Sequence, residues 1–364
     1  MKLAILGTRG IPNFHGGFEQ FAEYFSVHMA KCGHQVYVYN SHSHPYQEKV
    51  FEGVHIIHQK DPEESIGTFG QFLYDFNCIK DARSQGFDVI LQLGYTSSSI
   101  WGKFLPKQSV IVTNMDGLEW KRSKYSKPVQ KFLKVAEKLA VNSSDFLVSD
   151  SIGIQDYIKE KYGWDSKYIA YGANLFNNPD KNVLREYDLR EYEYNMLIAR
   201  LEPENNIEVI LDGVASSENG KPFIVIGKHE TKFGEFLKQK FKKVDRIKFL
   251  GGIYNQNHLD NLRYYSNLYF HGHSVGGTNP SLLEAMASNA FIIANDNVFN
   301  KSILGEDALY FKDANDVSNV LELSKKEYLV FTNANRDKVA SLYSWNHINK
   351  EYEHYLSKCL EESK

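Results

Sequence analysis

The chain contains few cysteines and little net charge, and each shortage excludes a class of protein. Its 364 residues include three cysteines, Cys32, Cys78 and Cys359, and no two of them have CxxC spacing. This pattern argues against a zinc site and a disulfide framework, and it favours a reducing cytoplasm. The net charge of -3 at pH 7 argues against a general nucleic-acid-binding protein.

The chain also has no long apolar segment. No stretch approaches the roughly 18 apolar residues of a membrane-spanning helix, and the N-terminal KLAILG enters a predicted strand at once. Any membrane contact is therefore expected to be peripheral. The composition, 42% hydrophobic and 24% charged, is that of a globular protein, and the length predicts two domains.

Strand-like and helix-like segments alternate along the sequence, which predicts parallel sheets covered by helices. The strands expected first are Lys2–Leu6, Val36–Tyr39, Asp88–Leu93, Val110–Thr113 and Phe146–Ser149, with helices over Phe18–Lys31, Phe69–Ser84 and Ile152–Tyr162. After a polar linker, Ala173–Tyr194, the expected strands are Met196–Ala199, Phe223–Ile226, Ile247–Leu250, Leu268–Phe270 and Phe291–Ala294. A last helix is expected from Asn346 to Leu360. The predicted fold class is α/β, with two doubly wound Rossmann-like domains and a cleft between them.

The most informative motif is HSVGGTNPSLLEAMA, from His273 to Ala287. Its residues for a tight turn and a capped helix start are Gly276, Gly277, Thr278, Asn279 and Pro280. Free N–H groups and the dipole at such a helix start favour an anion. The carboxylate of Glu284, one turn further, suits a sugar hydroxyl. The motif therefore predicts a phosphate at the helix N-terminus and a ribose at Glu284. An ordinary strand–loop–helix unit is the alternative.

A glycine-rich loop joins the first strand to the first helix. Its glycines include Gly16 and Gly17, where bare backbone can approach an anion near a helix start. The spacing matches neither G-x-G-x-x-G nor the P-loop pattern, and a flexible turn is the alternative. The histidines of Ser41–His44 lack helical metal spacing, so a loop is expected there rather than a metal site.

An arginine follows the first strand of the predicted second domain. Arg200 can meet a diphosphate with a forked pair of hydrogen bonds. The alternative is a surface salt bridge with Glu202 or Glu204. The motif at Gly276–Glu284 favours the diphosphate, because both segments are expected at strand ends of one sheet.

Two carboxylates follow the strand that ends near Thr113. Asp116 is expected on the cleft wall and Glu119 one helical turn later. Paired carboxylates can orient sugar hydroxyls or act as a base. Helix capping by Asp116 is the alternative.

A basic run with interleaved aromatic residues comes next. Its cations are Lys121, Arg122, Lys124, Lys127, Lys131, Lys134 and Lys138, and its aromatic residues are Trp120, Tyr125 and Phe132. This pattern is typical of a contact with an anionic membrane surface or a lipid phosphate. A solvated helix face is the alternative.

Taken together, these motifs resemble the retaining, nucleotide-sugar-dependent glycosyltransferases of the GT-B fold, the large bacterial family-four group. The resemblance covers essentially the whole chain. The stretches GGFEQFAE, MDGLEW, ARLEPENNIE and HSVGGTNPSLLEAM resemble a narrower branch, the rhamnosyltransferase-like enzymes of surface-polysaccharide assembly. The resemblance implies an acceptor-side domain over residues 1–174, a nucleotide-sugar-binding domain over 175–343, and a C-terminal helix over 344–364 that packs back on the first domain.

The resemblance also implies a role for each matching residue. Glu284 would bind the nucleotide ribose and Arg200 the diphosphate. The implied donor-binding residues are Gly16, Gly17, Arg200, Asn205, Gly277, Thr278, Asn279 and Glu284. The implied catalytic residues are Asp116, Arg200 and Glu284. The implied acceptor or membrane side consists of Glu119, Trp120, Lys121 and Arg122. The loop after Phe249–Gly251 would border the base, and neither a metal nor a cofactor is expected.

Three positions depart from the family's pattern. Gly276 stands where a second Glu commonly contacts the donor sugar, Asn205 stands where a Lys is usual, and Asp116 stands near the slot of a common His. The loss of a sugar-binding Glu and a cation argues against ordinary glucose-type donors. By analogy, a 6-deoxy-L-hexose such as rhamnose is compatible.

The expected reaction is sugar transfer with retention from a nucleoside diphosphate, with dTDP-rhamnose as one candidate donor. The acceptor would be a glycan or a polyprenyl-diphosphate-linked glycan in capsule, O-antigen or exopolysaccharide synthesis. The expected location is the cytoplasm, at the inner face of the cell membrane. A sugar-nucleotide epimerase on the same fold and a catalytically silent nucleotide-binding subunit are the alternatives. The base, linkage and oligomeric state are left open.

Overall fold

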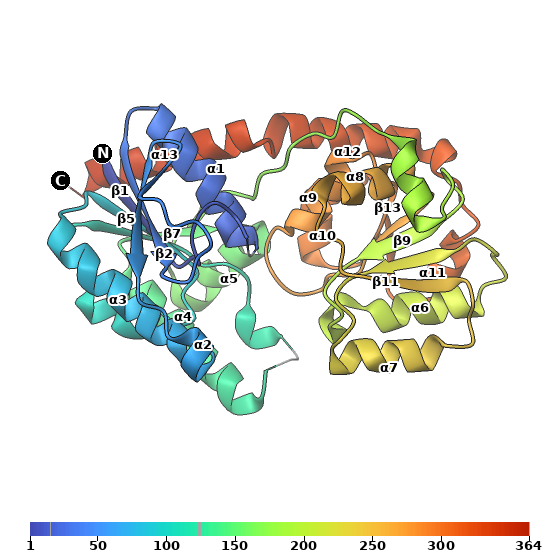
Figure 1. The fold of residues 1–364 in the computed structure, drawn as a ribbon, viewed down its shortest axis with the longest axis horizontal. Helices are drawn as coiled ribbons and strands as arrows, with labels where there is room; N and C mark the ends of the chain where they lie inside the picture. Colours follow the sequence, from blue (N-terminus) through green and yellow to red (C-terminus); the bar gives the residue numbers. More distant parts are fainter. Residues whose placement is uncertain (15, 123–124, 364) are drawn as a thin grey trace. The chain divides into compact units, whose positions relative to one another are not determined.

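The computed structural model describes residues 1–14, 16–122 and 125–363, which form two α/β units (Figure 1). The first unit contains Met1–Lys121, Tyr125–Tyr171 and the chain from Trp345 onward, and the second contains Arg122 and Gly172–Ser344. The boundaries expected from the sequence were 174 and 343. Each unit has one largely parallel sheet with helices packed on it, which confirms the predicted fold class.

The first unit is built on an eight-stranded sheet in the order β3-β4-β2-β1-β5-β6-β7-β8, parallel except for the β3–β4 pair. Its strands are β1 (Lys2–Leu6), β2 (Gln35–Ser41), β3 (Val50–Phe51), β4 (Val54–Gln59), β5 (Val89–Leu93), β6 (Val110–Asn114), β7 (Phe146–Ser149) and β8 (Lys167–Tyr168). Its α-helices are α1 (Gly17–Lys31), α2 (Glu63–Ile66), α3 (Phe69–Gln85), α4 (Lys127–Ser143), α5 (Ile152–Tyr162) and α13 (Trp345–Glu362).

The second unit is built on a six-stranded parallel sheet in the order β11-β10-β9-β12-β13-β14. Its strands are β9 (Asn195–Ile198), β10 (Phe223–Ile226), β11 (Ile247–Gly251), β12 (Tyr269–His271), β13 (Ile292–Asn295) and β14 (Leu309–Phe311). Its α-helices are α6 (Ile207–Ser216), α7 (Lys232–Phe241), α8 (Gln256–Tyr265), α9 (Pro280–Ala287), α10 (Val298–Leu304), α11 (Ala314–Val320) and α12 (Leu329–Leu342).

Apolar patterning explains where these elements lie. The residues of β5 and β10 are all buried, as expected for strands covered on both faces. Helix α1 buries Phe21, Ala22, Phe25 and Met29, the helically spaced residues that predicted it. Helix α5 begins at a Ser151 cap and ends at the left-handed Gly163, so local residues set both of its ends.

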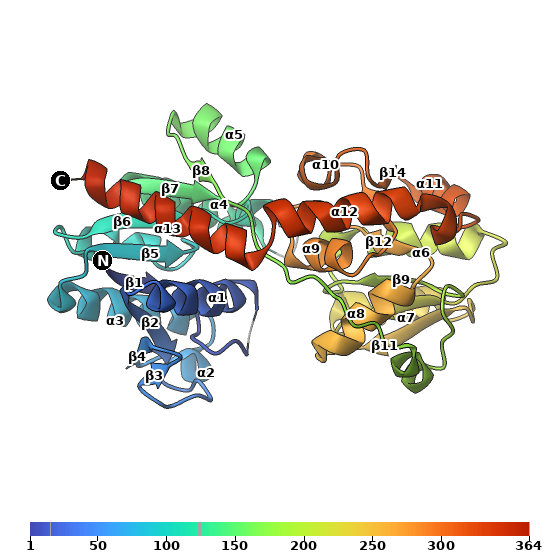
Figure 2. The ribbon, with the colours of Figure 1, turned by 90° about the horizontal axis from the view of Figure 1, so that it is seen from above.

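The last helix, α13, packs on α1 within the first unit (Figure 2). The ring of Tyr352 lies 4.6 Å from that of Phe21, and Trp345 stacks on Tyr24 at 4.5 Å between centroids. The Tyr352 hydroxyl also accepts a hydrogen bond from Asn114 Nδ2 at the end of β6, at 2.9 Å. These contacts make the chain's last helix part of the unit that holds its first strand.

The structure corrects several boundaries. The expected linker Ala173–Tyr194 includes a 3₁₀ helix, Lys181–Tyr187, that packs on α8 as part of the second unit. Its polar residues reflect surface exposure rather than a free connection. The strands β3, β4, β8 and β14 were not expected, because they have fewer buried apolar residues than the predicted strands. None of the described helices is long and apolar enough to cross a membrane.

Candidate functional site

Two polar loops of the second unit meet at the carboxyl ends of neighbouring strands. Strands β9 and β12 pair in parallel, with Met196 opposite Tyr269. The loops that follow are tied together, because Asn206 Nδ2 donates to the carbonyl of Gly272 at 2.8 Å and Ser274 Oγ donates to that of Glu204 at 2.7 Å. The segments that the sequence singled out separately therefore form one edge, the usual ligand-binding edge of such a sheet.

Arg200 lies in the first of these loops, directly after β9, and its side chain is exposed. Within the part of the chain that the structure describes, it forms no ion pair with Glu202 or Glu204. The structure therefore does not show the alternative, a local salt bridge of Arg200. The guanidinium keeps its full set of donors for an anionic ligand.

Asn205 has a different place from the one expected of a donor-binding residue. Its side chain is buried, and Nδ2 donates to the carbonyl of Arg200 at 2.7 Å. This bond fixes the backbone that carries the arginine. Asn205 thus positions Arg200, and its direct contact with a donor stays a prediction.

The second loop leads into α9 as the motif predicted. Asn279 caps the helix by accepting a hydrogen bond from the N–H of Ser281 at 2.9 Å, and Pro280 is the first helical residue. Gly276 has φ +127°, a value that side-chain-bearing residues rarely adopt. Gly277 follows it, and Thr278 is buried just before the cap. The turn therefore requires glycine for its backbone.

The carboxylate of Glu284 is paired with an arginine that was not predicted from the sequence. Arg263, on α8, is 1% exposed, and its Nη2 donates to Glu284 Oε2 at 2.6 Å. Its other partners are Asp260 Oδ1 at 3.0 Å and Ser281 Oγ at 3.2 Å. A buried cation must be paired, so Arg263 is held by Glu284 and in turn orients the Glu284 carboxylate. Glu284 remains 22% exposed, as a ligand-binding carboxylate requires. Only a fold that brings α8 beside α9 reveals the pair.

Two histidines at the end of β12 were also missed. Burial lowers the pKa of His273 to about 4, with a further lowering from the charges of Arg122 and Arg200. Burial also lowers the pKa of His271 well below its usual range. Their rings stack, with centroids 5.7 Å apart. Both are therefore neutral at pH 7 and add no charge to the Arg200 loop.

The glycine-rich loop of the first unit is tied down on both sides. Glu19 Oε1 accepts the N–H of Arg9 at 2.9 Å, and Glu23 Oε2 accepts that of Asn13 at 2.6 Å. Gly16 is the N-cap of α1, without a side-chain cap, and Gly17 is its first residue. These bonds tie the described part of the loop to α1 at Arg9 and Asn13.

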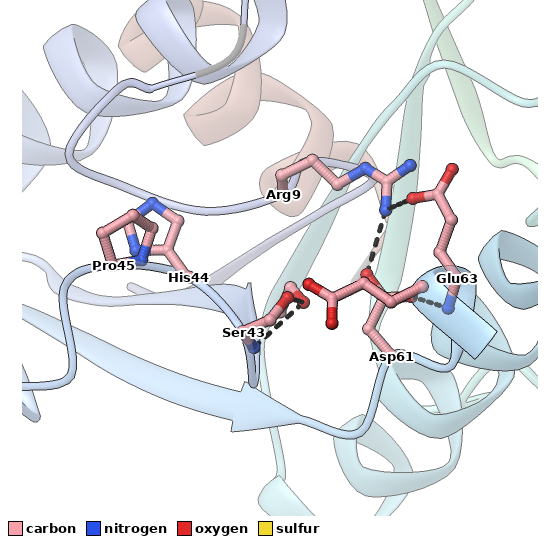
Figure 3. Close-up of a pocket in the computed structure, with 8 residues that line it drawn as sticks. Arg9, Ser43, His44, Pro45, Asp61 and Glu63 are labelled. Atoms are coloured by element: carbon pink, nitrogen blue, oxygen red, sulfur yellow. Dashed lines mark hydrogen bonds and ion pairs between the residues drawn. The ribbon is translucent and has the colours of Figure 1, made fainter. Parts of the chain in front are cut away.

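A pocket opens beside this loop, at the ends of β1, β2 and β4 (Figure 3). Its volume is roughly 310 Å³, and its lining residues are Arg9, Ser41, Ser43, His44, Pro45, Asp61, Glu63 and Glu64. Arg9 Nη1 donates to Asp61 Oδ2 at 2.9 Å and also pairs with Glu63. The Ser41–His44 stretch, expected as a loop, forms part of the wall. The pocket was not predicted, because its three lining segments lie far apart along the chain.

Asp116 and Glu119 occupy an irregular turn after β6 rather than successive turns of a helix. Asp116 has φ +50°, and its N–H bonds Asn114 Oδ1 at 2.9 Å. Glu119 is buried and begins a three-residue 3₁₀ helix, Glu119–Lys121. The left-handed Asp116 breaks the helical path, so the expected spacing of one helical turn is wrong.

Trp120 is fastened to the first unit. Its Nε1 donates to the buried Glu137 Oε2 at 3.1 Å, and the ammonium groups of Lys134 and Lys121 lie 4.3 and 5.5 Å from its ring centroid. Arg122 follows this turn, and Lys124 lies outside the described residues. Of the predicted acceptor-side residues, Trp120 and Lys121 thus belong to a cation-covered aromatic cluster, whereas Arg122 is grouped with the second unit.

Family models match both halves of the chain. Residues 1–174 match a domain of unknown function, DUF1972, and residues 186–326 match the glycosyl transferases group 1. The second match contains Arg200, Asn205, Arg263 and Glu284. A search of curated proteins found no match to the sequence.

Solved structures with the same fold are distant in sequence. Sucrose-phosphate synthase from Thermosynechococcus elongatus has a TM-score of 0.81 at 18% identity, with 100% of both chains covered. The Anabaena protein HepE in complex with UDP-glucose has a TM-score of 0.75 at 14% identity, covering 98% of this chain and 99% of its own. A glycosyltransferase from Rickettsia africae has a TM-score of 0.73 at 14% identity, with 99% of both chains covered. The chain therefore has the GT-B fold, and with the group 1 domain this supports a glycosyltransferase.

Proposed function

We propose that the chain is a retaining glycosyltransferase that moves a sugar from a nucleoside diphosphate to a hydroxyl of a glycan or lipid-linked acceptor. The observation that carries the proposal is the edge formed by the Arg200 loop and α9, which presents an exposed guanidinium together with a fixed carboxylate, Glu284. The group 1 match over this unit and the neighbours crystallised with UDP or UDP-glucose support the same assignment.

The donor would be held by charge at one end and by hydrogen bonds at the other. Arg200 and the N–H groups at the start of α9 would bind the diphosphate, and Glu284 would accept hydrogen bonds from ribose hydroxyls. During transfer the diphosphate leaves with growing negative charge, so these fixed donors stabilise the transition state more than the bound donor. Under this proposal the step requires no metal and no cofactor.

The bond changes define the proposed reaction. The bond between the anomeric carbon and the diphosphate oxygen breaks, and a bond from the acceptor oxygen forms on the same face. The acceptor proton passes to the departing phosphate oxygen, and Asp116 would orient the sugar or assist that transfer. The absence of a side chain at Gly276 favours a donor without a glucose-type hydroxyl pattern, and we propose rhamnose from dTDP-rhamnose.

We propose that the pocket lined by Arg9, Ser43 and Asp61 takes part of the acceptor. Its volume of roughly 310 Å³ suits a sugar ring, and its charged and hydroxyl groups match sugar hydroxyls. Filling it with Ser43→Trp, at an exposed position, should raise the KM for the acceptor and leave the donor KM unchanged. Equal effects on both KM values would argue against this assignment.

The basic face of α4 supports a membrane-linked acceptor in surface-polysaccharide assembly. Lys131, Lys134 and Lys138 are exposed there beside Val135, which is 55% exposed, and Leu139. Cations interleaved with apolar groups fit an anionic lipid surface. Sedimentation with anionic vesicles should retain the protein, and Lys131→Glu with Lys138→Glu should release it. Binding that is unchanged by the two substitutions would contradict this contact.

The test of the function itself is turnover of Arg200→Ala. A panel of uridine, thymidine and guanosine diphosphate sugars with glycan acceptors identifies the active donor. The variant should then lose about 100- to 1000-fold in kcat, as when one transition-state donor is removed, without a change in unfolding. The matched control is Arg190→Ala, an 84% exposed arginine of the same unit. Near-normal turnover of Arg200→Ala would overturn the assignment, and epimerised donor without transfer would replace it with an epimerase.

A further inference from the structure

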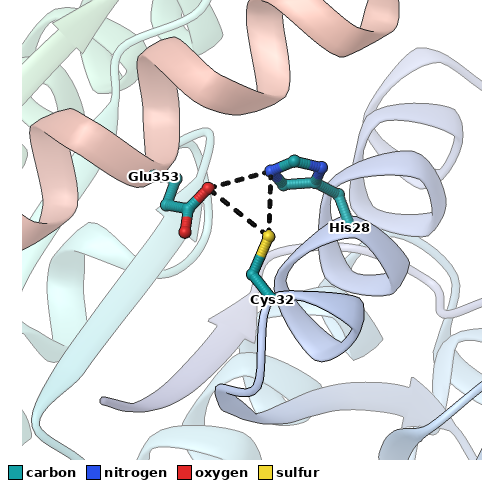
Figure 4. A group of neighbouring side chains, drawn as sticks. All are labelled: His28, Cys32 and Glu353. Carbon is teal, nitrogen blue, oxygen red and sulfur yellow. Dashed lines mark hydrogen bonds and ion pairs between the residues drawn. The ribbon is translucent and has the colours of Figure 1, made fainter.

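Three potential metal ligands converge where α13 packs on α1. His28 and Cys32 lie four residues apart on α1, so their side chains share one face, and Glu353 of α13 points at them (Figure 4). His28 Nε2 is 3.0 Å from Glu353 Oε2. The Cys32 sulfur is 3.6 Å from each of these two atoms.

These separations can be compared with the edges of a zinc tetrahedron. With Zn–N about 2.0–2.1 Å, Zn–S about 2.3 Å and Zn–O about 2.0–2.2 Å, tetrahedral angles place N and S about 3.6 Å apart, S and O about 3.5–3.6 Å apart and N and O about 3.3 Å apart. The two sulfur distances in the structure agree with these edges, and the N–O distance needs to lengthen by only about 0.3 Å. One ion could therefore contact all three atoms with small side-chain movements.

The surroundings of the three residues also suit a metal. His34 Nε2 lies 3.2 Å from Glu353 Oε1, the oxygen that faces away from His28. A ring N–H on the far oxygen of a ligating carboxylate is a common outer-shell arrangement that orients the ligand. Cys32 is exposed while His28 and Glu353 are partly buried, so an ion could enter from solvent and keep a water as its fourth ligand.

We propose that His28, Cys32 and Glu353 bind a zinc ion that joins α13 to α1, with His34 orienting the carboxylate. The set of imidazole, thiolate and carboxylate is one that zinc favours over magnesium or calcium. The ligands come from opposite ends of the sequence, so binding would stabilise the folded first unit. This site is independent of the proposed transfer reaction. The spacing of the cysteines from one another does not indicate such a site, because its other ligands would be His28 and Glu353.

The competing explanation is a cluster of hydrogen bonds without a metal. In that state burial raises the pKa of the Cys32 thiol, and the Glu353 carboxylate raises it further. The sulfur would then stay protonated at pH 7. A bound cation instead requires the thiolate, so spectroscopy of the sulfur distinguishes the two states.

The test uses the full chain, stripped with a chelator and titrated with Co²⁺, which takes tetrahedral zinc sites and absorbs visible light. We expect the intense visible bands of tetrahedral cobalt and a near-ultraviolet thiolate-to-cobalt band, both removed by adding Zn²⁺. Zinc should also raise the melting temperature of the wild-type protein. Cys32→Ser, at an exposed position, should lose the thiolate band and weaken zinc binding at least tenfold.

The matched control is His354→Ala, which removes an exposed histidine next to Glu353 on α13. This variant should bind zinc as the wild type does. The proposal is overturned by cobalt spectra without a thiolate band, by zinc affinity that Cys32→Ser leaves unchanged, or by an equal loss in His354→Ala.

Discussion

The loop after β12 and the turn after β6 follow central strands of their sheets, yet they are built by different means. After β12 the chain passes through Gly276 directly into a helix capped by Asn279. After β6 it turns at the left-handed Asp116 into a short 3₁₀ helix. That turn is held by partners distant in sequence, since Asn114 bonds Tyr352 and Trp120 bonds Glu137. Local residue chemistry thus sets the conformation of the first segment, and distant partners such as the Glu204 carbonyl and Arg263 only tie it in place. The second segment has no regular local pattern and depends on its long-range contacts.

The largest expected effect concerns the buried pair behind the first segment. Arg263→Met leaves Asp260 and Glu284 without their cation, so the free energy of unfolding should fall by about 3–5 kcal/mol. Urea unfolding followed by circular dichroism measures this. Arg190→Met, at an exposed arginine, should stay within about 0.5 kcal/mol of wild type. Equal values for the two variants would mean that Arg263 does not anchor α9.

The corresponding test for the turn after β6 is Glu137→Ala. Glu137 is 2% exposed and accepts hydrogen bonds from Trp120, Tyr157, Tyr162 and Lys161. Losing a shared buried acceptor should cost about 2–4 kcal/mol of unfolding free energy. Glu160→Ala, at an exposed position of α5, is the control and should be near neutral. A small effect at Glu137 would show that the turn holds itself without long-range support.

This contrast explains what the sequence could and could not reveal. The strands Lys2–Leu6, Phe146–Ser149 and Phe223–Ile226 and the helix Ile152–Tyr162 were predicted at their observed bounds, because each carries a clear apolar pattern and local end signals. The capped α9 was predicted for the same reason. Arg263, His271 and the Arg9 pocket were missed, because only tertiary packing places them. The helical spacing of Asp116 and Glu119 was wrong, because propensity does not show a left-handed residue held by distant contacts.

The loop after β12 should make the stability of the folded chain depend on pH through His273. The pKa of His273 is about 4 in the folded chain and about 6.5 in an unfolded chain, which therefore binds more protons between these values. The contribution of His273 to the free energy of unfolding is complete above pH 6.5 and is lost as the pH falls toward 4. Between pH 7 and pH 5 it should contribute a loss of about 2 kcal/mol. Between pH 7 and pH 5, the free energy of unfolding of His273→Gln should fall by less than that of the wild type. An equal fall in the two proteins would contradict this role of His273.

The smallest expected effect concerns the backbone of Gly276. A Cβ there would meet nothing within 4 Å, so any cost of Gly276→Ala comes from its φ of +127°. We expect about 1 kcal/mol of destabilisation in thermal or urea unfolding. Gly220→Ala, also in open space but without such a φ, is the matched control. Identical values would indicate that the loop relaxes, and that a side chain is tolerated at this position.

The most direct test of the central claim is a calorimetric titration of UDP, dTDP and GDP into the wild type, Arg200→Ala and Arg190→Ala. The account predicts that the wild type binds at least one of these nucleotides, that Arg200→Ala weakens it at least tenfold, about 1.4 kcal/mol, and that Arg190→Ala leaves it unchanged. Absence of binding to the wild type, or equal affinity of all three proteins, would contradict the claim that Arg200 and α9 form a nucleoside-diphosphate site.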